Sequence, residues 1–223
     1  MRGRLLVLEG VEGAGKSTQA ARLERALESA GRDTLLVREP GGTALGERIR
    51  ALLLAGQGEM TPAAEALLFM ASRAELVQRT IRPALERGTV VIADRFFLST
   101  YAYQCGGRAL PESVVRQANA LATGGLVPDL TLLLRLPPDA GLARAAGRGA
   151  ADRMERAGAE FHARVAAAFR VAESAAWQDA HPECGPIVPI DASGTEDEVA
   201  ERIQASVGLA YPDLAVRAAA EAS

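Results

Sequence analysis

Short apolar runs alternate with longer segments of helical spacing along this chain. Five of the runs have the length and composition of buried strands, namely residues 4–8, 34–37, 90–94, 130–136 and 187–190. Strands that alternate with helices form parallel sheets whose two faces are covered by those helices. The pattern therefore predicts an α/β fold with a five-stranded parallel sheet flanked by helices on both faces.

The same spacing predicts where the longer helices begin and end. After the first strand, a helix is expected to bury Leu23 and Leu27 and to stop at Gly31. A longer helix opens at Thr61 and Pro62, because threonine caps a helix and proline fits its first turn. The buried positions expected for this helix are Leu67, Ala71, Ile81 and Leu85.

The length of 223 residues suits one domain, and the chain shows neither a repeat nor a linker. We therefore expect a single domain over residues 1–223, closed by a last amphipathic run at 196–207. Between 141 and 164 the hydrophobic spacing breaks down and arginines and glycines accumulate, which predicts a small, mobile, arginine-rich lid. The Ala-rich end, 211–223, is expected to be a frayed tail.

Composition excludes several classes of protein. The chain has no run of eighteen apolar residues, and its start turns acidic and glycine-rich before a signal-peptide core can form. We therefore expect no membrane contact, no export and a cytoplasmic location. Cys105 and Cys184 stand apart without metal-ligand spacing, which favours two reduced structural thiols. The net charge of −3 disfavours a nucleic-acid partner.

One detail of composition directs attention to a single position. Among 25 lysines and arginines, Lys16 is the only lysine. It therefore marks a place that needs a compact point charge and where a planar guanidinium would not fit. It lies in a glycine-rich stretch that satisfies GxxxxGK[ST] between the first predicted strand and helix. Such a loop turns its backbone N–H groups toward phosphate oxygens, with Lys16 at the β and γ phosphates and Ser17 as a Mg²⁺ ligand.

Two charged residues follow the buried run at 90–94. Asp94 holds the place of the acid that P-loop enzymes keep near Mg²⁺, and its alternative is a helix cap or a solvated strand end. Arg95 comes directly after a buried strand, which indicates that an anion binds there.

Four blocks of sequence follow one another in a specific order. They are residues 9–18, Arg-Glu-Pro-Gly-Gly-Thr at 38–43, Phe-Met-Ala-Ser-Arg at 69–73, and Asp-Arg-Phe at 94–96 with Ser99, Thr100, Ala102, Tyr103 and Gln104. With these blocks the chain resembles the bacterial thymidylate kinases, which are P-loop nucleoside monophosphate kinases, over nearly its whole length. The resemblance implies the P-loop NTP hydrolase fold, ATP and Mg²⁺ as cofactors, dTMP as substrate, dTDP and ADP as products for dTTP biosynthesis, and a homodimer.

The resemblance also implies roles for individual residues. The nucleotide phosphates would contact Gly10, Val11, Glu12, Gly13, Ala14, Gly15, Lys16, Ser17 and Thr18. The dTMP site would comprise Glu12, Pro40, Phe69, Arg73, Arg95, Ser99, Thr100, Tyr103 and Gln104. In it Arg95 would hold the phosphate, Glu12 would meet the 3′-hydroxyl and Phe69 would pack on thymine. Tyr103 would fill the space of a 2′-hydroxyl, and Ser17 and Asp94 would serve the metal.

The aromatic residues support a site for a planar base independently. Five of them fall within one stretch of 35 residues, namely Phe69, Phe96, Phe97, Tyr101 and Tyr103. The alternative for Phe96 and Phe97 is that they fill the core. Phe69 and Arg73 share a helix face, and Arg73 can only donate hydrogen bonds, which suits a thymine carbonyl better than a cytosine amine. The alternative for Arg73 is an ion pair with Glu65 or another nearby acid on the helix surface.

The phosphate loop contains no arginine, so the resemblance implies that catalytic arginines come from the predicted lid. Arg148 and Arg153 are assigned as catalytic, and Arg144 is expected near the adenine. Lys16, Arg95 and Glu12 complete the residues assigned as catalytic. Arg156 and Arg170 are expected on a solvated helix face.

Two positions depart from the family pattern and receive no role. The family usually has an acid where this chain has Arg135, and a tyrosine where it has Phe169. The main alternative function is another pyrimidine nucleoside monophosphate kinase. A GTPase switch would need an Asn-Lys-x-Asp motif, which a chain whose only lysine is Lys16 cannot contain, and the acidic balance disfavours an arginine-rich nucleic-acid binder.

Overall fold

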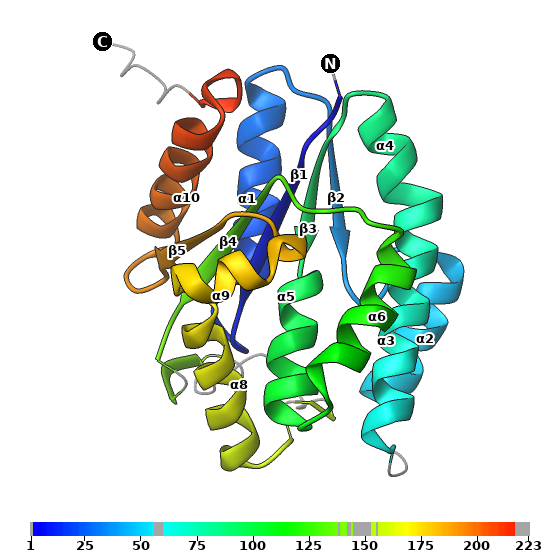
Figure 1. The fold of residues 1–223 in the computed structure, drawn as a ribbon. Helices are drawn as coiled ribbons and strands as arrows, with labels where there is room; N and C mark the ends of the chain where they lie inside the picture. The colour runs from blue at the N-terminus through cyan, green and yellow to red at the C-terminus, as the bar shows by residue number, and fades with distance from the viewer. Residues whose placement is uncertain are drawn as a thin grey trace.

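The computed structural model describes residues 2–55, 60–137, 139–141, 144, 153–154 and 156–216. Their five strands form one sheet in which all neighbouring pairs are parallel, in the order β2-β3-β1-β4-β5. The strands are β1 (Leu5–Gly10), β2 (Thr34–Arg38), β3 (Val90–Asp94), β4 (Leu130–Arg135) and β5 (Ile187–Asp191). The predicted fold class is confirmed, with β1 at the centre of the sheet (Figure 1).

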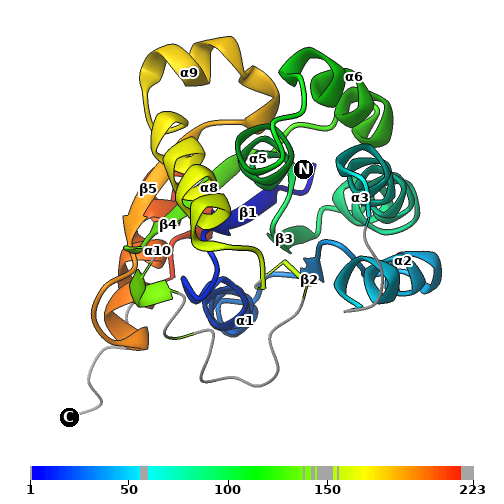
Figure 2. The same ribbon diagram turned by 90° about the horizontal axis from the view of Figure 1, so that it is seen from below.

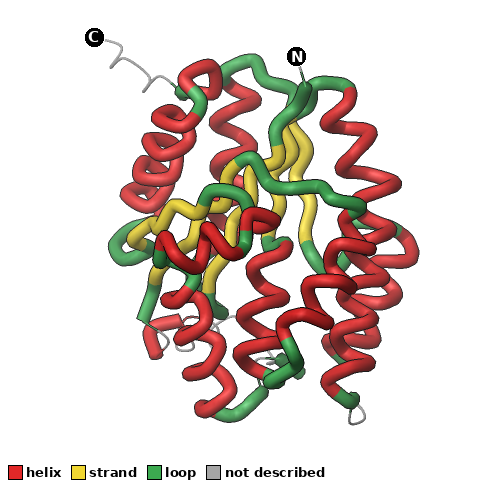
Figure 3. The backbone as a smooth tube through the Cα atoms, in the orientation of Figure 1, coloured by secondary structure: helices red, strands yellow, loops and turns green. Residues whose placement is uncertain are grey.

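Helices surround the sheet on both faces (Figures 1 and 3). On one face α1 (Lys16–Ser29) contacts α10 (Glu196–Ala210), which the short η4 (Pro212–Leu214) follows. The other face and the β2 edge carry α2 (Ala44–Leu54), α3 (Pro62–Leu76), η1 (Val77–Ile81), α4 (Arg82–Glu86), α5 (Phe97–Thr100), η2 (Tyr101–Gly107), α6 (Glu112–Thr123), α8 (Ala159–Val171), α9 (Ala175–Ala180) and η3 (Pro182–Cys184). No helix within the described ranges is both long enough and apolar enough to span a membrane.

The side chains of β1 explain why two layers of helices are needed. Leu5 and Val7 belong to the core that includes α3, α5 and α8, whereas Leu6 and Leu8 belong to the core with α1 and α10. A strand that is apolar on both faces is stable only between two covering layers. Figure 2 shows these layers end-on.

Predicted and observed boundaries differ by one or two residues. β1 extends to Gly10, where the sequence predicts an end at residue 8, and β4 ends at Arg135, one residue early. α1 buries Leu23 and Leu27 and ends before Gly31, as predicted.

The buried face predicted for α3 is wrong in part. Ile81 is buried further along the same continuous helix, as expected, but Leu67 is 63% exposed and Ala71 is also exposed. Glu65 and Arg73 occupy buried positions of α3 instead. Hydrophobicity alone assigns the wrong face because it does not register charged side chains that are buried as pairs.

The predicted lid is only partly within the described residues. Its last part, from Ala159, is the first half of α8, where Phe161 is buried and Arg164 donates to the Gly107 carbonyl at 3.0 Å. Residues 142–143, 145–152 and 155 lie outside the described ranges.

The structure differs from the predicted frayed tail at its beginning. The Tyr211 hydroxyl donates to the Asp129 carbonyl at 2.8 Å, and Arg4 lies over the Tyr211 ring at 4.3 Å. Leu214 is buried against the sheet. These contacts attach the segment up to residue 216 to the domain, whereas 217–223 lie outside the described residues.

Candidate active site

The loop between β1 and α1 depends on glycine geometry. Gly10 and Gly13 have φ angles of 142° and 70°, which other residues rarely adopt. A Cβ on Gly13 would lie 1.9 Å from the Gly141 carbonyl oxygen. No side chain caps the N-terminus of α1, so the partial positive charge of its first turn faces the loop. This is the backbone that phosphate binding requires.

Lys16 is buried at the start of α1. Its Nζ donates to the Val11 carbonyl at 2.7 Å. Burial, and after it the charge of Arg95, lower the pKa of Lys16 to about 8, although Glu12 and Asp94 oppose the shift. An anion at the loop would therefore be met by a cation that has little water around it.

Ser17 and Asp94 lie together, as the sequence predicts for a metal site. The Ser17 hydroxyl donates to Asp94 Oδ2 at 2.5 Å. Mg²⁺ in nucleotide enzymes usually binds one or two protein oxygens and takes its other ligands from phosphates and water. A hydroxyl and a carboxylate fit that requirement, and no cluster of three or more His, Cys, Asp or Glu that could hold a metal occurs in the described ranges.

Arg95 connects the end of β3 to the phosphate loop. Its φ of 72° lies in the left-handed region, which is costly for a side-chain-bearing residue and is found mainly where function requires it. Its guanidinium donates to the Glu12 carboxylate at 2.8 Å, the Gly10 carbonyl at 3.1 Å and the Ser99 hydroxyl at 3.0 Å. The Tyr103 hydroxyl donates to Glu12 at 2.8 Å. The structure thus brings together four residues assigned to the substrate site.

The charge state of Glu12 follows from these neighbours. Burial acts to raise the pKa of Glu12, but the charges of Arg95 and Lys16 outweigh it and hold the pKa at about 2. Glu12 is therefore an ionised acceptor at neutral pH.

A second carboxylate, for which the sequence predicts no role, lies behind Arg95. Glu9 is fully buried on β1 and accepts from the Phe96 N–H at 2.9 Å, the Ser99 N–H at 3.0 Å and the Ser99 hydroxyl at 2.5 Å. Burial raises the pKa of Glu9, and Arg95 opposes the rise. Glu9 fixes the turn from β3 into α5 and so sets the position of Ser99.

A cavity of about 620 Å³ extends from the phosphate loop to α3, a volume that suits a small organic ligand. Most residues assigned from sequence line it, namely Glu12, Gly13, Gly15, Lys16, Ser17, Pro40, Phe69, Arg73, Asp94, Arg95, Ser99, Thr100, Tyr103 and Gln104. Phe69 is half-buried at this wall, whereas Phe96 and Phe97 are 0% and 2% exposed. The core interpretation of Phe96 and Phe97 is therefore confirmed.

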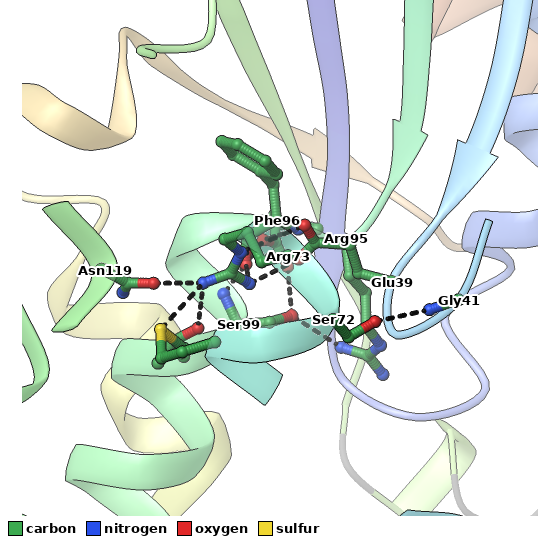
Figure 4. A network of polar contacts seen from close by, with 11 residues as sticks. Glu39, Gly41, Ser72, Arg73, Arg95, Phe96, Ser99 and Asn119 are labelled. Carbon is green, nitrogen blue, oxygen red and sulfur yellow. Dashed lines mark hydrogen bonds and ion pairs between the residues drawn. The ribbon is translucent and has the colours of Figure 1, made fainter. Parts of the chain in front are cut away.

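Arg73 lies in a network of buried polar groups (Figure 4). Its Nε and Nη2 donate to Glu39 Oε2 at 2.8 and 2.5 Å. Nη2 also donates to the Phe96 carbonyl at 2.9 Å. Nη1 donates to the Thr100 hydroxyl at 2.8 Å and to the Asn119 amide oxygen. All five N–H groups of Arg73 therefore have protein acceptors.

Glu65 is another fully buried carboxylate, on α3. It accepts from Gln104 Nε2 at 3.0 Å, Arg108 Nη2 at 3.0 Å and Arg153 Nη1 at 2.7 Å. The Nε of Arg153 donates to the Leu53 carbonyl at 2.8 Å. Arg153, assigned as catalytic from the sequence, thus contacts Glu65 and is not among the described residues that line the cavity.

The alternative considered for Arg73, an ion pair with Glu65 or another nearby acid on the helix surface, is wrong. Arg73 pairs with Glu39 in the interior, and Glu65 pairs with Arg108 and Arg153. Glu39 was missed although it lies in the 38–43 block, because a buried ion pair leaves no signal in hydrophobic spacing.

Of the other arginines considered in and after the predicted lid, all but Arg148 lie within the described residues. Arg144 is exposed, with Nη1 3.4 Å from the Ala192 carbonyl, and Arg148 lies outside the described residues. Arg156 and Arg170 are both exposed, as predicted, but Arg156 lies in a turn before α8 and only Arg170 is on a helix.

The structure also describes the two residues that depart from the family pattern, Arg135 and Phe169. Arg135, whose side chain is 58% exposed, pairs with Glu173 at 3.2 Å. Phe169 is buried, with its ring centroid 6.2 Å from that of Tyr103.

Comparisons with known proteins identify the family of this chain. The family model described as thymidylate kinase matches residues 8–203. A thymidylate kinase of Deinococcus radiodurans is 48% identical over 206 residues, which cover 92% of this chain and 97% of that protein. One from Synechococcus sp. (strain JA-2-3B'a(2-13)) is 50% identical over 93% of this chain and 95% of its own length. The chain belongs to the thymidylate kinase family.

Proposed function

We propose that this chain transfers the γ-phosphoryl group of MgATP to dTMP, giving dTDP and ADP. The observation that carries the proposal is one cavity that joins the Lys16 loop, the Arg95 guanidinium and the Phe69 wall. A deoxynucleotide whose base lies at Phe69 and whose phosphate lies at Arg95 would present that phosphate to the loop. Donor and acceptor phosphates would then meet inside the cavity.

The protein's task in this reaction is alignment and positive charge, because phosphoryl transfer passes through a loose transition state. Lys16 supplies a cation at the loop, and Arg95 holds the acceptor phosphate. Arg95 is fixed in advance by its bonds to Glu12 and Ser99, so little reorganisation accompanies the reaction. The dTMP phosphate is itself the nucleophile, and no general base is needed.

Mg²⁺ is the proposed metal, and Ser17 and Asp94 would hold it. When bound, it supplies positive charge to the phosphate oxygens. Of the two arginines in the predicted lid that are assigned as catalytic, Arg148 remains the proposed catalytic cation, because the Arg153 guanidinium contacts Glu65.

The sugar and base contacts are proposed from the same cavity. Ionised Glu12 suits the 3′-hydroxyl as a donor, and the Tyr103 ring fills space beside it. Phe69 would pack on the thymine. Direct donation from Arg73 to a thymine carbonyl requires one of its existing bonds to be shared, since each N–H already has an acceptor.

The test is ADP formation from MgATP with dTMP, dUMP, dCMP, dGMP and AMP, each supplied separately at equal concentration. We expect the highest kcat/KM with dTMP. A higher value with dCMP or dUMP would replace the proposal with the alternative, another pyrimidine nucleoside monophosphate kinase.

We further propose that the chain forms a homodimer through α2, α3 and α6, which lie side by side (Figure 2). Large apolar residues are exposed along these helices, namely Leu45, Leu52, Leu67, Val114 and Leu121. Leu45 and Leu52 are seven residues apart, as are Val114 and Leu121, so each pair lies on one helix face. A second copy of this chain would cover the exposed face.

Sedimentation equilibrium at micromolar protein concentration tests the homodimer. The wild-type chain is expected to be a dimer and Leu67→Glu a monomer, because a carboxylate would be buried at the interface. Leu209→Glu is the matched control, since Leu209 is 87% exposed on α10. A monomeric wild type, or a dimeric Leu67→Glu variant, would contradict this proposal.

A further inference from the structure

The side-chain amide of Gln104 has one end engaged and one end free. Gln104 lies in η2, is 2% exposed and lines the cavity. Its Nε2 donates to Glu65 Oε1 at 3.0 Å. In the part of the chain that the structure describes, no donor contacts Gln104 Oε1. This atom is also not completely buried, because the buried side-chain atoms that lack a partner in the described ranges are Gln19 Oε1, Arg82 Nε and Asn119 Nδ2. The carbonyl end of the amide therefore faces the cavity.

Glu65 determines that the carbonyl end of the Gln104 amide, and not its NH₂ end, faces the cavity. Burial acts to raise the pKa of Glu65, but hydrogen bonds from Arg108 and Arg153 outweigh it, and the pKa lies below its ordinary value. An ionised carboxylate can only accept hydrogen bonds. The NH₂ end of Gln104 must therefore point to Glu65, and a flipped amide would place two acceptors against each other.

We propose that Glu65 is a positioning residue which holds the carbonyl of Gln104 toward the base and thereby selects pyrimidines that carry hydrogen on N3. The proposal rests on the proposed function, since it places the base at Phe69. Thymine and uracil have an N3–H that donates to Gln104 Oε1. Cytosine has an unprotonated N3, which would face the same oxygen as a second acceptor.

Beside Gln104, Thr100 offers a hydrogen-bond donor where Gln104 offers an acceptor. Its hydroxyl oxygen accepts from Arg73 Nη1 at 2.8 Å, and in the described structure the hydroxyl donates to no protein atom. The hydroxyl hydrogen is thus available to a carbonyl adjacent to N3. A donor from Thr100 and an acceptor from Gln104 match the edge of thymine and oppose the amine and bare nitrogen of cytosine.

Glu65→Gln tests the assignment with little change of shape. The new amide can donate, so Gln104 is free to turn its own NH₂ group to the cavity. We expect the ratio of kcat/KM for dTMP to that for dCMP to fall by about 10- to 100-fold, the usual effect of an unpaired buried donor or acceptor. The ratio for dTMP and dUMP should not change, because both bases carry N3–H.

Arg108→Gln is the matched control. It removes one cation from Glu65 at 3.0 Å but keeps the carboxylate that faces Gln104. We expect dTMP and dCMP to be affected equally. Equal losses for the two substrates in Glu65→Gln would show that Glu65 only supports the fold, and would overturn the proposal.

A double-mutant cycle asks whether Glu65 acts through Gln104. Gln104→Leu should lower the dTMP to dCMP ratio by itself, and adding Glu65→Gln should change that ratio no further. An independent effect in the double variant would contradict the proposal. If Glu65→Gln does not fold, Glu65→Asp is the substitute, because its shorter side chain retains the charge but moves it away from Gln104. An unchanged dTMP to dCMP ratio in Glu65→Asp would also contradict the proposal. A wild-type enzyme without preference for dTMP would instead contradict the proposed function.

Discussion

Charged side chains have different partners at the two ends of the cavity, the phosphate end around Lys16 and Arg95 and the base end around Arg73. At the phosphate end, Lys16 Nζ donates to a backbone carbonyl, and Arg95 shares its carboxylate partner, Glu12, with a tyrosine. At the base end, Arg73 is saturated by Glu39 and its neighbours. Lys16, whose Nζ bonds a neutral carbonyl, keeps its charge for an anionic ligand, whereas the charge of Arg73 is compensated by Glu39 beside a neutral base.

Mutations at the two ends should therefore affect different properties of the enzyme. A cation that meets phosphate contributes mainly to the transition state, so its loss lowers kcat. A cation that is paired inside the protein contributes to the pocket's shape, so its loss lowers stability and selectivity.

The largest effect is expected from Lys16→Arg, which should lower kcat by about 10⁴-fold, a loss within the range attributed to cations at this transition state. The buried site suits an ammonium and leaves no room for a guanidinium fork. Steady-state kinetics measure the loss, and an unchanged melting temperature shows that the fold is intact. Arg25→Lys, at an exposed position of the same helix, is the control. A folded Lys16→Arg variant with normal kcat would contradict the role of Lys16 as a compact cation at the phosphates.

The two arginines of the predicted lid that are assigned as catalytic should differ in their effects on kinetics. Arg148→Ala should lower kcat by about 10³-fold, as loss of a catalytic arginine does. Arg153→Ala should instead raise the KM for dTMP more than it lowers kcat, because Arg153 contacts Glu65 at the base end. Full kinetic profiles of both variants separate the two outcomes. The reverse pattern would place Arg153 at the phosphates.

Removing one partner of the buried pair at the base end should destabilise the fold. Glu39→Gln leaves Arg73 charged and unpaired, and we expect a loss of about 3 to 5 kcal/mol in the free energy of unfolding. Arg38→Gln breaks the exposed pair with Glu47 and should cost about 1 kcal/mol or less. Denaturant titrations measure both, and equal losses would mean that burial of the pair does not matter.

The smallest effect concerns pH. With a pKa of about 8, Lys16 is charged below that pH and loses its proton above it. The kcat/KM for MgATP should therefore fall above pH 8, by about tenfold per pH unit, as one essential proton is lost. A flat profile up to pH 10 would show that Lys16 keeps its proton in the free enzyme.

The phosphate end could be predicted from sequence because its chemistry comes from adjacent residues. One loop supplies the glycines, Lys16 and Ser17, and the parallel sheet brings Asp94 beside them, since β1 and β3 are neighbours. The alternation of strands and helices was equally local, which is why the fold class was predictable.

The base end could not be predicted to the same depth. Glu39 follows β2, Arg73 lies on α3 and Asn119 lies on α6, so their contacts depend on tertiary packing. The sequence predicts Leu67 in the core because apolar residues are usually inside, and it considers Glu65 only as a surface partner in the alternative for Arg73. The structure reverses both, since Arg108, Arg153 and Gln104 together satisfy Glu65.

Product identification with [γ-³²P]ATP tests whether this chain phosphorylates dTMP. The enzyme is supplied with Mg²⁺ and an equimolar mixture of dTMP, dUMP, dCMP and AMP, and the labelled products are separated. Most of the label should appear in dTDP, as the proposed function requires. Label predominantly in another diphosphate, or in inorganic phosphate while dTMP remains, would contradict it.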